Sequence, residues 1–357
     1  SRSMGFARAA SAVESALVPR LFVSRVDGLA SIPSAASLDM SGVQVLLPAA
    51  STASSAPNPP LLSCLGIDDG RQRPSAAIST ARIDGALGSH GAPLLLASRC
   101  DVTFNGTLVQ GMTLGSAGVA LLQAQNGASL NLHDSALVHL ESSGAALSLS
   151  AASSLVMTGA HWQNISSSSS SPLHVSGGSM ASISGAALVE GMQAQGQLSS
   201  GGWAQATDSQ ISLDAATAGG LGMMIAASTA LSGGALALRN SHLSIRAGQV
   251  DYAPSSRVFF VGNSAQQGGV LSATSDSSAS LNGGVSMQHN SAAQRGGAVY
   301  LERASLSIDS TGFNSRFESD ESCTSHAHAS PCSAARAPAA TVFSSNAATT
   351  EGGAVFS

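Results

Sequence analysis

The chain has 357 residues, of which 43% are hydrophobic, 10% charged and 4% aromatic, and its formal net charge is −5. All fifteen basic residues are arginines and no basic run occurs, which argues against nucleic-acid binding. So few aromatic residues argue against an ordinary globular core, whereas a solenoid of many small layers needs none. Disorder is the alternative, but it normally accompanies low hydrophobicity, and the mean hydropathy here is +0.20.

Residues 1–80 contain most of the prolines and a stretch of serine and alanine. Proline removes a donor from a β-ladder and is poorly tolerated in central strands. We therefore predict an irregular segment or an N-terminal cap over 1–80, with short strands such as Val43 to Leu47. The first residues include no uninterrupted apolar run of the kind that a signal peptide needs.

A period of 26 residues appears after about residue 80. Leucines recur at this spacing at Leu95, Leu121, Leu147 and Leu173, and a second apolar series is formed by Phe104, Leu130, Val156 and Ile183. Each lies in a short stretch that alternates apolar and polar residues, which indicates half-buried strands. Two or three such strands separated by Gly, Asn and Ser turns predict one coil of a parallel β-helix. We therefore predict an all-β solenoid over 81–357, with about ten coils of 26 to 28 residues.

A sharper repeat marks the C-terminal half, where an apolar residue, an asparagine three positions later and a glycine pair recur. Its members are Phe260, Asn263, Gly268 and Gly269, then Met287, Asn290, Gly296 and Gly297, and finally Phe343, Asn346, Gly352 and Gly353. Asparagine tolerates left-handed backbone and its amide can bond nearby backbone groups. Amides stacked at strand spacing can also form ladders. Glycine allows the positive φ and close approach that a larger residue would block.

This FxxN and GGA[ILV] pair resembles the repeat of the chlamydial polymorphic outer-membrane proteins, also seen in large surface proteins of algae and protists. The clear matches cover about residues 219–357. The resemblance implies a right-handed parallel β-helix of the pectin-lyase-like type, the architecture of autotransporter adhesins. The sequence departs from the repeat where Val270 replaces alanine and Met287 replaces phenylalanine.

Two cysteines and two histidines fall in an insertion loop that we place at about 313–338. Cys323 and Cys332 are predicted to form a disulfide, and the alternative is a tetrahedral zinc site that also uses His326 and His328. Ordinary zinc modules separate their ligand pairs further, and a loop of small residues offers little support for the ligands, which favours the disulfide. Cys64 and Cys100 either pair or remain small buried apolar residues.

Three further features have competing interpretations. The uncharged run from Gly219 to Leu238 is long enough to span a bilayer, but its glycine pairs and few bulky residues favour a solenoid core. Asn105 and Asn164 begin N-glycosylation sequons, which matter if the protein is secreted by a eukaryote.

Parallel β-helices also include polysaccharide lyases and hydrolases, which need carboxylates gathered on one face. Acidic residues are scattered here, and we find no aspartate that recurs at coil spacing. We therefore predict no catalytic residue, cofactor or metal, with a polysaccharide-acting enzyme as the alternative. The expected function is a structural and adhesive segment of an extracellular or cell-surface protein, with a protein or glycan as its partner. Because the chain stops inside a repeat, we expect further β-helix or membrane-anchor domains in the same polypeptide.

Overall fold

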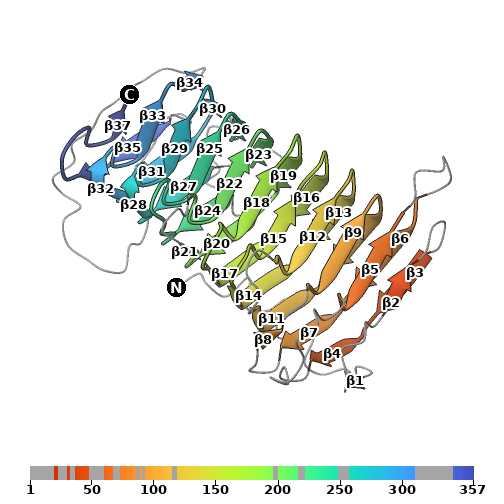
Figure 1. Ribbon diagram of the computed structural model, residues 1–357. Helices are drawn as coiled ribbons and strands as arrows, with labels where there is room; N and C mark the ends of the chain where they lie inside the picture. The colour runs from red at the N-terminus through yellow and green to blue at the C-terminus, as the bar shows by residue number, and fades with distance from the viewer. Residues whose placement is uncertain are drawn as a thin grey trace.

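A computed structural model describes residues 20–22, 30–32, 37–47, 60–66, 73–85, 89–90, 93–114, 119–195, 200–215, 222–247, 257–309 and 341–357. These residues form strands and turns, and the strands stack in parallel as a β-solenoid (Figure 1). The predicted all-β parallel β-helix is therefore confirmed. Within the described ranges, no helix is long and apolar enough to cross a membrane. The uncharged run between Gly219 and Leu238 contributes strands to the solenoid instead.

Each coil adds one strand in turn to three sheets, here named A, B and C. Sheet A stacks β1 (Arg20–Phe22), β4 (Gln44–Leu47), β7 (Arg82–Gly85), β11 (Leu108–Leu114), β14 (Ala136–Ser142), β17 (His161–Ser167), β20 (Ala187–Glu190), β24 (Met223–Ala226), β27 (Val258–Val261), β31 (Val285–Gln288) and β35 (Val342–Ser344), with β8 (Ser89–His90) beside β11 and β21 (Gln193–Ala194) beside β17.

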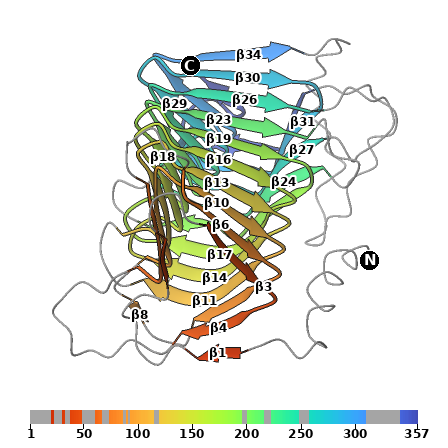
Figure 2. The same ribbon diagram turned by 90° about the vertical axis from the view of Figure 1, so that its right-hand side faces the viewer.

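Sheet B stacks β2 (Ala30–Ile32), β5 (Leu62–Leu65), β9 (Leu95–Ser98), β12 (Leu122–Gln125), β15 (Leu147–Leu149), β18 (Leu173–Ser176), β22 (Ala204–Thr207), β25 (Leu236–Arg239), β29 (Leu271–Thr274), β33 (Val299–Glu302) and β37 (Val355–Phe356). Sheet C, seen face-on in Figure 2, stacks β3 (Ser37–Ser41), β6 (Ser75–Ser79), β10 (Asp101–Asn105), β13 (Ser129–His133), β16 (Ser154–Thr158), β19 (Met180–Ser184), β23 (Gln210–Asp214), β26 (His242–Arg246), β30 (Ser278–Asn282) and β34 (Ser305–Asp309). A small fourth sheet contains β28 (Ser264–Gln267), β32 (Ser291–Arg295) and β36 (Ala347–Ala348).

The stack extends closer to the N-terminus than residue 80, where we expected regular coils to begin. Strand β3 pairs with β6 over five residues, from Ser37 with Ser75 to Ser41 with Ser79. Strand β4 likewise pairs with β7 over four residues. The described strands of the N-terminal segment therefore belong to the same three sheets as the later coils.

The strand register in sheet B shows that coil length varies. Leu95 pairs with Leu122 rather than with Leu121, and Leu122 pairs with Leu147. The predicted equivalence of Leu121 with the other leucines is therefore wrong by one residue. Leu121 is still buried, because it begins the turn into the same strand.

Sheet C corrects the second predicted series in the same way. Phe104 pairs with Leu132, and Leu132 pairs with Met157. Leu130 therefore stacks one inward position earlier, and Val156 faces outward with 37% of its surface exposed. A one-residue change in turn length moves a position to the opposite face of a strand, so a constant spacing of 26 does not follow the core.

The core is a continuous column of inward-facing side chains that runs along the stack. Strands typically show alternating burial, as in β6, β13 and β23. The largest fully buried side chains include Trp162, Trp203, Phe104 and Phe260, and the rest of the core consists mainly of Leu, Ile, Val, Met and Ala. Each coil thus buries its apolar face against its neighbours, as solenoids do.

Candidate functional site

The three motif asparagines form a buried ladder between sheet A and the small fourth sheet. The Nδ2 amide of Asn263 donates to Oδ1 of Asn290 at 3.0 Å, and Nδ2 of Asn290 donates to Oδ1 of Asn346 at 2.9 Å. The same amide groups of Asn263 and Asn290 also donate to the carbonyl oxygens of Ile225 and Phe260. These side chains hold successive coils together and are too deeply buried to meet a ligand.

Earlier coils have apolar residues in the same column. The register aligns Met112 with Leu140, and Leu140 with Ile165, and all three are buried. The residues just before the last two, His139 and Asn164, have φ values of 52°. The bend therefore needs a left-handed residue in front of it, while the buried position itself accepts either an apolar or an amide side chain.

The glycine pairs allow neighbouring coils to approach closely. Gly268 has a φ of 63°, and a Cβ on Gly297 would overlap the carbonyl oxygen of Gly353 in the next coil. The structure adds an equivalent pair whose second member is Gly202, since a Cβ there would overlap a backbone oxygen of the following pair. Sequence reasoning missed it because Trp203 follows where the motif has alanine.

Cys64 and Cys100 form a disulfide that joins two successive coils. Their Cα atoms lie 5.9 Å apart and both residues are fully buried. Cys323 and Cys332, with their predicted insertion loop and the zinc alternative, lie outside the described residues. In the described part of the chain, no group of three His, Cys, Asp or Glu side chains could hold a metal ion.

Both sequon asparagines are exposed. Asn105 ends β10, and Asn164 lies at the bend within β17. The Nδ2 amide of Asn164 is 3.4 Å from Nδ1 of His139 in the preceding coil.

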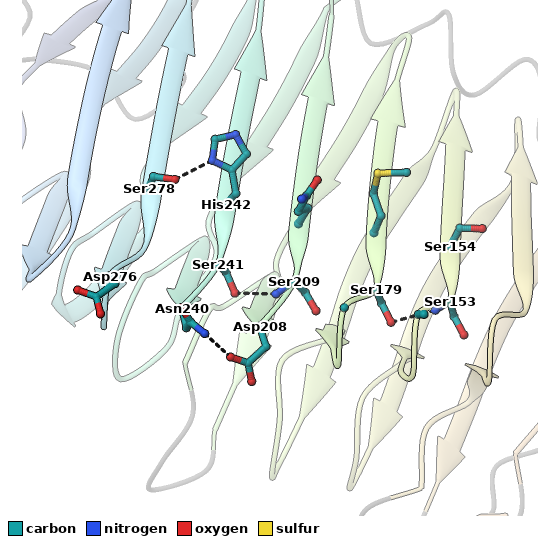
Figure 3. Close-up of a pocket in the computed structure, with 14 residues that line it drawn as sticks. Ser153, Ser154, Ser179, Asp208, Ser209, Asn240, Ser241, His242, Asp276 and Ser278 are labelled. Atoms are coloured by element: carbon teal, nitrogen blue, oxygen red, sulfur yellow. Dashed lines mark hydrogen bonds between the residues drawn. The ribbon is translucent and has the colours of Figure 1, made fainter.

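A groove of about 610 Å³ runs along the corner between sheets B and C and crosses five coils, from β16 to β30 (Figure 3). Three rows of residues line this corner groove, one residue of each row from each coil. The corner row contains Ala152, Gly178, Asp208, Asn240 and Asp276; the serine row contains Ser153, Ser179, Ser209 and Ser241; and the outward row of sheet C contains Ser154, Met180, Gln210, His242 and Ser278.

The backbone explains which residue types occupy the corner row. Asp208, Asn240 and Asp276 have φ values of 51°, 47° and 61°. Among residues other than glycine, Asn and Asp are enriched in this left-handed region. The turn therefore selects for Asn or Asp but does not distinguish the charged side chain from the neutral one.

The buried serine row forms the floor of the corner groove. The backbone N–H of Ser209 donates to Oγ of Ser241 at 3.2 Å, and that of Ser153 donates to Oγ of Ser179 at 3.2 Å. Ser241 Oγ in turn donates to the carbonyl of Arg239 at 2.7 Å. Ser209 Oγ has no hydrogen-bond partner among the described residues, although only 6% of Ser209 is exposed.

The exposed polar groups of the corner groove interact across coils. Asn240 Nδ2 donates to Asp208 Oδ1 at 2.6 Å, and His242 Nδ1 lies 2.7 Å from Ser278 Oγ. Figure 3 shows Asp208 and Asn240 turned toward each other, with Asp276 on the next coil. No arginine lines the groove, so two carboxylates determine its charge.

The alignment of Asp208 with Asp276 corrects the expectation that no aspartate recurs at coil spacing. The serines that follow the corner residues are 32 residues apart from Ser209 to Ser241, and 36 apart from Ser241 to Ser277. These coils are longer than the 26 to 28 residues that we assumed. An available signal was the pair of Asp or Asn and Ser that precedes each alternating strand.

No protein-family model, curated protein or solved structure matches this chain. The corner groove is therefore interpreted from its own geometry and charge.

Proposed function

We propose that the chain is a structural and adhesive segment of an extracellular or cell-surface protein, and that it presents the corner groove to a glycan or a protein. The groove carries this proposal because it offers polar side chains from five successive coils along one line. Coils stack at about 4.8 Å, so an extended polymer in the groove would meet equivalent groups at each step.

Two other properties support this role. The side chains stand on a hydrogen-bonded scaffold, and a preorganised surface loses less entropy when it binds. The Cys64–Cys100 disulfide is typical of proteins in oxidising compartments. The resemblance of the C-terminal motif to repeats of surface adhesins agrees with both.

A binding screen against immobilised glycans and matrix proteins tests the proposal. We expect saturable binding that Gln210→Trp, in the outward row of the groove, weakens at least tenfold. Gln123→Trp, on an outward position of sheet B, is the matched control and should bind like the unmodified chain. Absence of binding throughout the screen would overturn the proposal. Cleaved products in the glycan arm would instead favour a polysaccharide-acting enzyme.

A further inference from the structure

We propose that the ligand of the corner groove is a linear polysaccharide with free amino groups, an inference that rests on the proposed binding function. Three properties of the groove lead to this ligand class: its charge, the spacing of its carboxylates and the chemistry of its other side chains.

The charge of the corner groove favours a cationic ligand. Asp208 and Asp276 are both exposed, and none of the lining residues is an arginine. One oxygen of Asp208 accepts from Asn240, whereas neither carboxylate forms an ion pair with any described residue. A groove of one sign attracts the opposite charge and repels its own. Polymers of uronic acids or sulfated sugars are therefore disfavoured, and amines are favoured.

The spacing of the carboxylates suits an extended sugar chain. Asp208 and Asp276 occupy equivalent positions two coils apart, which corresponds to about 10 Å at the usual strand spacing. In an extended β-linked polysaccharide, one sugar is about as long as one coil step and alternate sugars present the same side. Amines on alternate sugars would then face the two carboxylates. An extended peptide instead repeats its same-side groups every 6.6–6.8 Å or so.

The remaining side chains favour a hydroxyl-rich ligand over a protein. Protein interfaces depend on buried aromatic or large apolar anchors, and the only large apolar residue that lines the groove is Met180. Gln210, Ser154 and Ser278 instead offer donors and acceptors for sugar hydroxyls. The Ser209 hydroxyl on the floor, which has no partner among the described residues, would gain one by rotating toward such a ligand.

Titration calorimetry with three probes of equal length tests this ligand class: a glucosamine hexasaccharide, its fully N-acetylated counterpart and a galacturonate hexasaccharide. We expect the glucosamine probe to bind at least tenfold more tightly than the acetylated one, and the galacturonate probe not to bind. Added salt should weaken the glucosamine complex, because exposed charge interactions are screened.

Isosteric variants locate the effect. The double variant Asp208→Asn with Asp276→Asn keeps the side-chain shape and the preference for left-handed backbone. It should lower affinity for the glucosamine probe at least tenfold and leave weak binding of the acetylated probe unchanged. Asp309→Asn, an exposed aspartate of sheet C outside the groove, is the control and should have no effect. Unchanged thermal unfolding of both variants would show that they fold normally.

The outcomes separate the two proposals. Equal binding of the glucosamine and acetylated probes, or an unchanged affinity in the double aspartate variant, would overturn the amino-sugar ligand but not the binding function. Tighter binding of a lysine hexapeptide than of the glucosamine probe would overturn it in favour of a basic protein segment. If no probe binds and the wider screen also finds no ligand, both proposals fail.

Discussion

Replacement of Asn290 by alanine tests whether the amide ladder stabilises the stacked coils. Asn290 Oδ1 accepts from the backbone N–H of Asn263 at 2.9 Å and from its Nδ2 at 3.0 Å. Asn290 Nδ2 donates to the Phe260 carbonyl and to Asn346. The truncation leaves the N–H of Asn263 buried without its acceptor, at a cost of about 1–3 kcal/mol. Each of the other three lost bonds adds about 0.5–1.5 kcal/mol.

The expected loss is therefore at least about 2 kcal/mol of local opening free energy, which corresponds to roughly 30-fold faster amide exchange. Hydrogen exchange followed by mass spectrometry on peptides covering 257–267 measures it directly. A local readout is needed because solenoids do not always unfold in a single two-state step.

The matched control is Asn282→Ala, which truncates an outward asparagine of β30. We expect it to change stability by less than about 0.5 kcal/mol. If peptides 257–267 exchange no faster in the Asn290 variant than in this control, the ladder does not stabilise the coils and the reasoning is refuted.

Three further outcomes are expected. Gly297→Ala should cost about 1–3 kcal/mol of unfolding free energy through overpacking, whereas Gly353→Ala, whose added Cβ would have only an ordinary contact, should be nearly neutral in urea denaturation. Joint replacement of Cys64 and Cys100 by alanine should cost about 3–4 kcal/mol, and a non-reduced peptide map without this cross-link would contradict the bond. Burial lowers the pKa of His174, so the unfolded chain takes up its proton first and stability should fall as the pH drops through about 6.5. The fall should level off once the folded state is also protonated, and His174→Gln should remove this part of the dependence; an identical pH profile for both proteins would contradict it.

Local patterns were sufficient to predict the fold. Alternating apolar and polar residues between short turns require half-buried strands, and their recurrence every 26 to 28 residues requires stacking. The motif residues Asn263 and Asn290 could be aligned from sequence because the same local signature surrounds each of them. Their burial and mutual hydrogen bonds follow from that alignment.

The corner groove could not be predicted by counting residues. Asp208, Asn240 and Asp276 lie in coils whose lengths differ from one another and from the earlier coils. The insertions leave the stack between strands, so they change the distance along the chain without changing the strand pairing. Only the observed register brings the two aspartates to equivalent corners.

The sequence by itself determined that this protein is a parallel β-solenoid, because the alternation of side chains and the turn residues are local properties of each coil. The tertiary structure alone decided which positions share a column, including that Val156 faces outward while Met157 enters the core. The physical reason is that hydrogen bonds between coils depend on which strand residues face one another. The number of residues in the intervening turns can vary without disturbing those bonds.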